Sequence, residues 1–121
     1  MATRCNVQIS DKDTSLWIYR HWDGYPECTR VELEEILKTR HPQSANELGD
    51  LLVGEFGSNY RYTEGEHGDI EYLYQIYIGE LYYTIHTISI YFYIDENKEY
   101  KTTRKHLNTI LISYETDKPN D

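Results

Sequence analysis

The densest group of side chains that could bind a ligand is the run YRHWDGYP, residues 19–26. Arg20 offers a planar guanidinium for a phosphate or carboxylate, and Trp22 and Tyr25 offer ring faces for stacking. A helix is expected to begin at the end of this run, and a helix N-terminus favours anions. The run therefore predicts a site for a nucleotide-like ligand. Its candidate ligand-binding residues are Arg20, His21, Trp22, Asp23 and Tyr25.

A structural role explains the same run without any ligand. In that alternative His21 bonds Asp23, Trp22 packs in the core, and Gly24 and Pro26 make a turn. The sequence leaves both interpretations open.

Three further residues join the candidate site. Arg4 lies on a strand expected to pair with the strand that ends in the run, and Phe92 offers another ring. Arg104 begins Arg104-Lys105-His106, a tight basic run in an otherwise acidic chain. Such a run is usually solvated, but beside the first cluster, or beside that of a second subunit, it could clamp phosphates.

Sequence motifs for catalysis are missing. The chain contains no HExxH, CxxC, P-loop, GxSxG or GxGxxG pattern, and its five histidines are scattered. His86 and Thr87 match one half of a two-histidine phosphoesterase motif, without the second copy that this chemistry needs. We therefore expect no enzymatic activity, no metal and no cofactor.

The net negative charge of the chain limits the kinds of partner that it can bind. Twenty-one acidic residues against twelve Lys and Arg give a formal charge of −9, which argues against wrapping a nucleic-acid backbone. An alternative function is an acidic, DNA-mimicking inhibitor of a host defence nuclease, although acidic outward faces are also ordinary in amphipathic helices. The acids concerned lie on two expected helices and are Glu27, Glu32, Glu34, Glu35, Glu47, Asp50 and Glu55.

The elements that must position these residues follow from hydrophobic periodicity. Residues 3–10 alternate, and 15–22 follow a polar turn as a second strand with large residues on both faces, so the two predict a hairpin. Helices are expected from 26–28 to about 39 and from Ser44, a capping box with Glu47, to about 56. Strands 70–78 and 81–93 flank a two-residue turn, and 103–114 fits a helix or, as we favour, a strand. The prediction is an α+β fold, with an antiparallel sheet of about five to six strands and two helices inserted between an N-terminal hairpin and a C-terminal β-meander.

We expect residues 1–115 to form a single domain and 116–121 a disordered tail. The chain has no apolar run of membrane-spanning length and no signal-like start, and two cysteines are too few for a disulfide framework. A cytoplasmic location is therefore expected, with no membrane and no direct nucleic-acid partner.

Thr3-Arg4 and the YRHWDGYP run resemble the start of a group of small phage and prophage proteins, over roughly residues 1–40. With its size, two helices and Tyr-rich strands, the chain resembles the Thoeris anti-defence sponge family. That resemblance implies a phage protein in the bacterial host cell that sequesters a cyclic ADP-ribose-type immune signal, or in some members cyclic oligonucleotides, without cleaving it. It also implies a homo-oligomer, a dimer or an assembly of dimers, with pockets between subunits.

Overall fold

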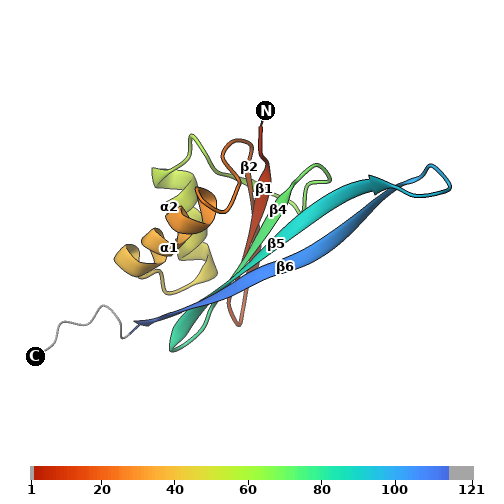
Figure 1. Ribbon diagram of the computed structural model, residues 1–121. Helices are drawn as coiled ribbons and strands as arrows, with labels where there is room; N and C mark the ends of the chain where they lie inside the picture. Colours follow the sequence, from red (N-terminus) through yellow and green to blue (C-terminus); the bar gives the residue numbers. More distant parts are fainter. Residues whose placement is uncertain (1, 115–121) are drawn as a thin grey trace, which may run out of the picture.

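The computed structural model describes residues 2–114 as one sheet with two helices against it (Figure 1). The tail expected at 116–121 lies outside the described residues. In chain order the elements are β1 Cys5–Ser10, β2 Ser15–Arg20, α1 Thr29–Arg40, α2 Ala45–Glu55, β3 Arg61–Thr63, β4 Tyr72–Ile78, β5 Tyr82–Ile94 and β6 Tyr100–Ser113.

The sheet has six strands in the order β3-β2-β1-β4-β5-β6. This confirms an α+β fold whose sheet is mostly antiparallel, since β1–β2, β2–β3, β4–β5 and β5–β6 all pair in that way. The expectation of a purely antiparallel sheet is wrong at one pair, because β1 and β4 run parallel. Both helices and β3 intervene between β2 and β4, and a connection of that length lets β4 enter beside β1 in the same direction. The three-residue edge strand β3 was not predicted.

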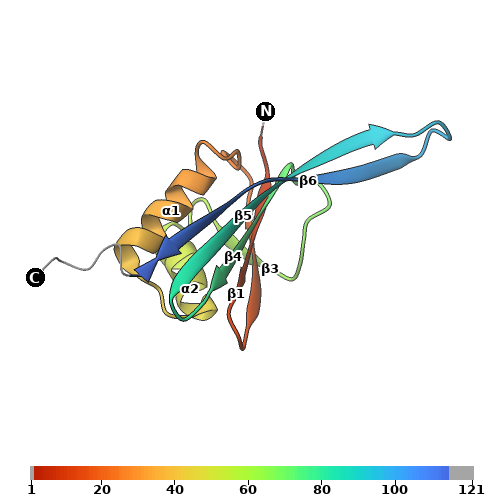
Figure 2. The same cartoon turned by 60° about the horizontal axis from the view of Figure 1, so that its bottom comes forward.

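Both helices lie on the same face of the sheet (Figures 1 and 2). The alternation of β1 places Cys5, Val7 and Ile9 on that face, where each is 0% exposed. Helical spacing turns one seam of each helix toward them and buries apolar area, the main source of folding free energy. The buried seam residues are Leu33, Ile36 and Leu37 of α1 and Leu48 and Leu52 of α2.

The capping box expected at α2 is confirmed in its first half. Ser44 Oγ accepts a hydrogen bond from the N–H of Glu47 at 3.1 Å. Glu47 reaches one residue further back than the motif predicts, because its Oε2 accepts from the N–H of Gln43 at 2.7 Å. No helix within residues 2–114 is long and apolar enough to cross a membrane.

The opposite face of the sheet carries a smaller apolar cluster and a polar row. Tyr19, Ile70, Leu73 and Ile90 form the cluster, next to the loop of residues 64–70. The row follows the strand register and includes Gln8, Gln75, His86 and Thr109. Neither α1 nor α2 covers this face.

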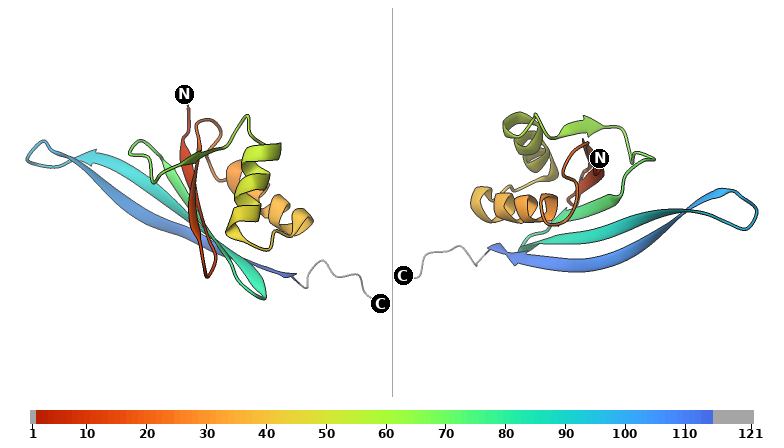
Figure 3. Two further views of the ribbon diagram at one scale, coloured as in Figure 1. Left: turned by 180° about the vertical axis from the view of Figure 1, so that it is seen from behind. Right: turned by 45° about the horizontal axis from the view of Figure 1, so that its top comes forward.

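Beyond the body, β5 and β6 continue as a two-stranded arm, residues 91–105, which projects well away from the helices (Figures 1 and 3). The segment 103–114, which fitted a helix or a strand by sequence, belongs to β6 up to Ser113, so the strand interpretation is confirmed.

Candidate functional site

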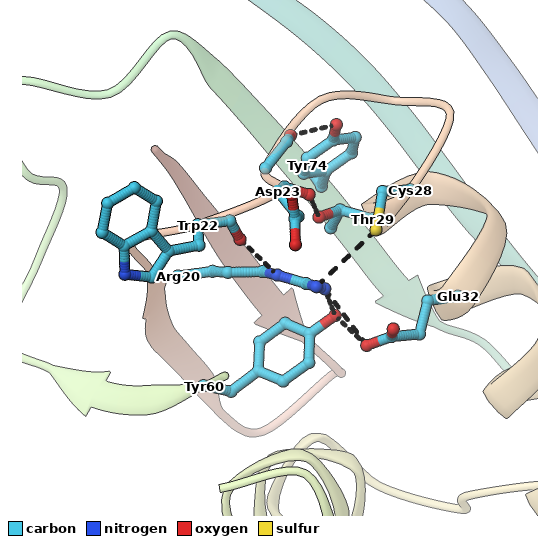
Figure 4. Close-up of polar contacts among 9 residues, drawn as sticks. Arg20, Trp22, Asp23, Cys28, Thr29, Glu32, Tyr60 and Tyr74 are labelled. Carbon is cyan, nitrogen blue, oxygen red and sulfur yellow. Dashed lines mark hydrogen bonds and ion pairs between the residues drawn. The ribbon is translucent and has the colours of Figure 1, made fainter. Parts of the chain in front are cut away.

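Arg20 points to the helix-covered side of the sheet and is only 3% exposed (Figure 4). Its Nε donates to the carbonyl of Trp22 at 2.7 Å, and its Nη1 donates to Tyr60 Oη at 2.7 Å and to Glu32 Oε1 at 3.1 Å. Nη2 lies 3.7 Å from Cys28 Sγ. The guanidinium is committed to internal partners, which corrects the expectation that Arg20 faces a ligand.

The charge on Arg20 survives burial because of its neighbours. Burial opposes the charge, but Tyr60 and Glu32 outweigh it and raise the pKa of Arg20. Burial raises the pKa of Tyr60 as well, so its hydroxyl stays protonated and donates to Glu32 Oε1 at 2.7 Å. These hydrogen bonds therefore connect the end of β2 to α1, through Glu32, and to the residue before β3, Tyr60.

The turn after Arg20 is also held by internal contacts. Gly24 N–H donates to the carbonyl of Thr3 at 2.8 Å, and the carbonyl of Gly24 accepts from Tyr74 Oη at 2.6 Å. Thr29 Oγ1 donates to the carbonyl of Asp23, whose φ is 60°. Several residues of the YRHWDGYP run thus have structural roles. The structural alternative given above is wrong in two details, because His21 contacts Tyr19 rather than Asp23 and Trp22 is exposed rather than packed in the core.

Two of the predicted arginines contact one surface loop instead. Arg4 Nε lies 3.3 Å from Asp69 Oδ2, and Arg104 forms an ion pair with Glu66. Both acids belong to the loop of residues 64–70. Arg4 Nε is buried yet has no hydrogen-bond partner, so the contact with Asp69 leaves this donor unsatisfied.

Aromatic rings lie at the other side of the same loop. His67 stacks on Tyr19 with centroids 4.0 Å apart, and Arg61 lies over the Tyr19 ring at 5.0 Å. Tyr19 Oη is 2.9 Å from His21 Nδ1, and the rings of His21 and Trp22 meet edge to face at 4.8 Å. Trp22 remains 59% exposed despite this ring contact.

We call this group the loop cluster. It brings together four of the eight predicted ligand residues. Sequence reasoning missed the other five members. The sequence offered a polar, His-containing loop as a signal for three of them and the first Tyr of the run for a fourth, and it offered no signal for Arg61. The members are Arg4, Tyr19, His21, Trp22, Arg61, Glu66, His67, Asp69 and Arg104.

Tyr25 and Phe92 lie apart from the loop cluster. The carbonyl of Tyr25 accepts hydrogen bonds from the N–H groups of Cys28 and Thr29 at the start of α1. Phe92 lies on the arm, opposite Thr102. No hydrogen bond, ion pair or ring contact described for residues 2–114 links either side chain to the loop cluster.

Two cavities lie elsewhere, and none of the eight predicted ligand residues lines them. One, of about 490 Å³, runs beside α1 and includes Cys28 and Glu32. The other, which we call the end cavity, has a volume of about 790 Å³ and lies where the β1–β2 and β4–β5 turns meet. Its lining includes Asp11, Asp13, Tyr77, Glu80, Leu81 and Tyr82.

Within residues 2–114, no three His, Cys, Asp or Glu side chains are grouped to hold a metal ion. Comparison of the chain with protein-family models, with curated proteins and with solved structures found no match.

Proposed function

We propose that the chain binds a small anionic, ring-containing ligand at the loop cluster and holds it without cleaving it. The ligand class is a cyclic nucleotide immune signal of the cyclic ADP-ribose type, or a cyclic oligonucleotide, as the resemblance to phage anti-defence sponges implies. One observation carries the proposal. Arg4 and Arg104 each hold a carboxylate of the same loop, beside a row of aromatic rings.

Those two carboxylates mark positions where an anion is attracted. Ion pairs as exposed as these contribute about 0–1 kcal/mol each, so incoming phosphates can replace Glu66 and Asp69 at low cost. A phosphate offers more acceptor oxygens and can bind a guanidinium in two places. It can also satisfy the free donor of Arg4. The exposed ring of Trp22 offers a stacking face for a base.

The loop cluster is an open surface in one copy of the chain, and high affinity needs enclosure on several sides. We therefore propose that the functional unit is a homo-oligomer, acting in the cytoplasm of a bacterial host, with no membrane or nucleic-acid partner.

Thermal-shift titration with cyclic ADP-ribose isomers and cyclic dinucleotides tests this function, because a ligand of the folded state raises Tm by mass action. We expect one of these ligands to raise Tm, and the ligand released by heating to be chemically intact. The Arg4→Gln/Arg104→Gln double variant should lose the shift. Arg40→Gln, which removes an exposed arginine paired with Glu55, should keep it. An altered ligand, or no shift with any of these probes, contradicts the proposal.

The second candidate is the acidic inhibitor that binds a host nuclease. Several of the helix acids that it needs already have partners, since Glu32 contacts Arg20, Glu34 contacts Arg30 and Glu55 contacts Arg40. Glu27, which precedes α1, and Glu35, on α1, are exposed. Loss of nuclease inhibition in Glu27→Gln/Glu35→Gln, with inhibition kept in Arg4→Gln/Arg104→Gln, would favour this candidate.

A further inference from the structure

Two histidines meet on the sheet face that neither helix covers. His86 lies on β5 and His106 on β6, and their ring centroids are 5.6 Å apart. His86 Nδ1 is 2.8 Å from Thr109 Oγ1, and His106 Nε2 is also 2.8 Å from that oxygen. One nitrogen of each ring is therefore directed at the same point between the two strands.

A β-bulge puts the two rings on the same face of the sheet. His106 and Thr109 are three positions apart, so on a regular strand their side chains would face opposite sides. The pairing of β5 with β6 slips by one residue at Leu107, which has no partner. Thr109 therefore lies opposite His86. His106 lies opposite Ile88, which is two positions further along β5 and so on the same side. Bulges of this kind often re-aim a side chain next to a functional site.

Converging imidazole nitrogens are ligands for a divalent transition-metal ion. Neutral imidazole is the commonest metal ligand in proteins, and it suits Ni²⁺, Cu²⁺ and Zn²⁺ rather than Mg²⁺ or Ca²⁺. A metal–nitrogen bond is about 2.0–2.1 Å long, so two nitrogens on one ion lie at most about 4 Å apart. Both nitrogens already contact one oxygen, and small rotations of the two side chains can bring them onto an ion in its place.

The charges around the two rings allow a cation to bind. The chain has a formal charge of −9, and a negative field raises the local concentration of cations. Lys105 is next to His106 on the strand and therefore points to the other face of the sheet. Arg104 shares the face of His106, but its charge is offset by the ion pair with Glu66. The basic neighbours in the sequence therefore do not exclude a metal ion.

We propose that His86 Nδ1 and His106 Nε2 bind a divalent transition-metal ion between β5 and β6. Within residues 2–114 no third His, Cys, Asp or Glu side chain joins them, so water fills the remaining coordination positions. The expectation of no metal came from missing spacing motifs, and a site formed by strand register contains none of them. The inference does not rest on the proposed function, because neither histidine belongs to the loop cluster.

Isothermal titration with Ni²⁺ tests this site. We expect one Ni²⁺ per chain and no comparable binding of Mg²⁺. His86→Asn and His106→Asn should each lower the affinity by about tenfold or more, because either variant leaves a single imidazole. Thr109→Val should keep the affinity, since it removes only the hydroxyl between the rings. His67→Asn is the matched control and should also keep it, because it removes a histidine of the loop 64–70 instead.

A second measurement needs no variant. Paramagnetic Ni²⁺ should broaden the NMR signals of residues 86–88 and 106–109 before those of any other segment. Earlier broadening elsewhere overturns the inference, as does the absence of binding at about 1 mM Ni²⁺, the range of the weakest complexes. Unchanged affinity in a folded His86→Asn or His106→Asn variant, checked by circular dichroism, overturns it as well. So does a loss of affinity in His67→Asn that equals theirs.

Discussion

Arg20 donates a hydrogen bond to the phenol oxygen of Tyr60, with 2.7 Å between Nη1 and Oη, although the two residues are 40 positions apart. Both groups also contact the same oxygen of Glu32. The contact joins the end of β2 to the segment that leads into β3. Arg20, which the sequence predicted to bind a ligand, therefore has a structural role inside the protein.

Replacing Arg20 by Met should destabilise the fold rather than only weaken a ligand. Removing one partner of a buried ion pair costs about 3–5 kcal/mol, and the lower end is expected here because Glu32 remains partly exposed. Urea denaturation measures the change. Arg40→Met, at an exposed pair with Glu55, should have little effect. Unchanged stability of Arg20→Met would contradict the scaffold role.

Gly24 should not tolerate a side chain. A Cβ at this position would lie 2.8 Å from the carbonyl oxygen of Thr3 and 2.9 Å from Cys5 Cβ, and neither belongs to a flexible side-chain end. We expect Gly24→Ala to lower the free energy of unfolding by about 1–3 kcal/mol. Gly54→Ala, which has open space and helical backbone, should raise it by about 0.5–1 kcal/mol. Equal effects of the two substitutions would be inconsistent with the close packing at Gly24.

Stability should fall at alkaline pH. Burial raises the pKa of Cys5 from 9.0 to about 12 and raises the pKa of Tyr60 and of Tyr74 above their ordinary value of 10.0. The folded chain keeps these protons where the unfolded chain releases them. Their contribution is therefore complete below about pH 9 and is lost as the pH rises toward and beyond 12.

Phenolate absorbance, followed together with circular dichroism, checks this order. Tyr60 and Tyr74 should ionise only as the fold is lost, because burial raises the pKa of both. Tyr60→Phe should therefore reduce the phenolate signal that appears together with unfolding. Ionisation of Tyr60 in a chain that is still folded would show that it is not protected.

Removing the loop carboxylates should strengthen ligand binding. Glu66→Gln with Asp69→Asn frees Arg104 and Arg4 from competing anions, each worth at most about 1 kcal/mol, so affinity should rise about two- to tenfold. Isothermal titration with the ligand found by thermal shift measures the gain. Asp50→Asn, at an acid that accepts from Tyr62 instead, is the control. Weaker binding in the double variant would mean that the loop acids contact the ligand directly.

Local sequence patterns were enough to predict most of the helices and strands. The alternation of Cys5, Val7 and Ile9 predicted a half-buried strand, and Ser44 with Glu47 predicted the start of α2, because periodicity and capping depend on residues close in sequence. The choice of strand for 103–114 was right for the same reason. Not one of these patterns contains the order of strands in the sheet. The parallel β1–β4 pair and the short β3 therefore came only from the tertiary structure.

For the candidate site, too, the sequence predicted one part and the tertiary structure decided the rest. The sequence determined that Arg4, Trp22 and Arg104 are groups able to bind an anionic ring system, because that follows from residue type. Only the tertiary structure decided which of them gather, since the contacts of Arg4 and Arg104 with loop 64–70 span 65 and 38 positions. It also turned Arg20 inward, because residues next to each other on a strand face opposite sides and the helices cover only one of them.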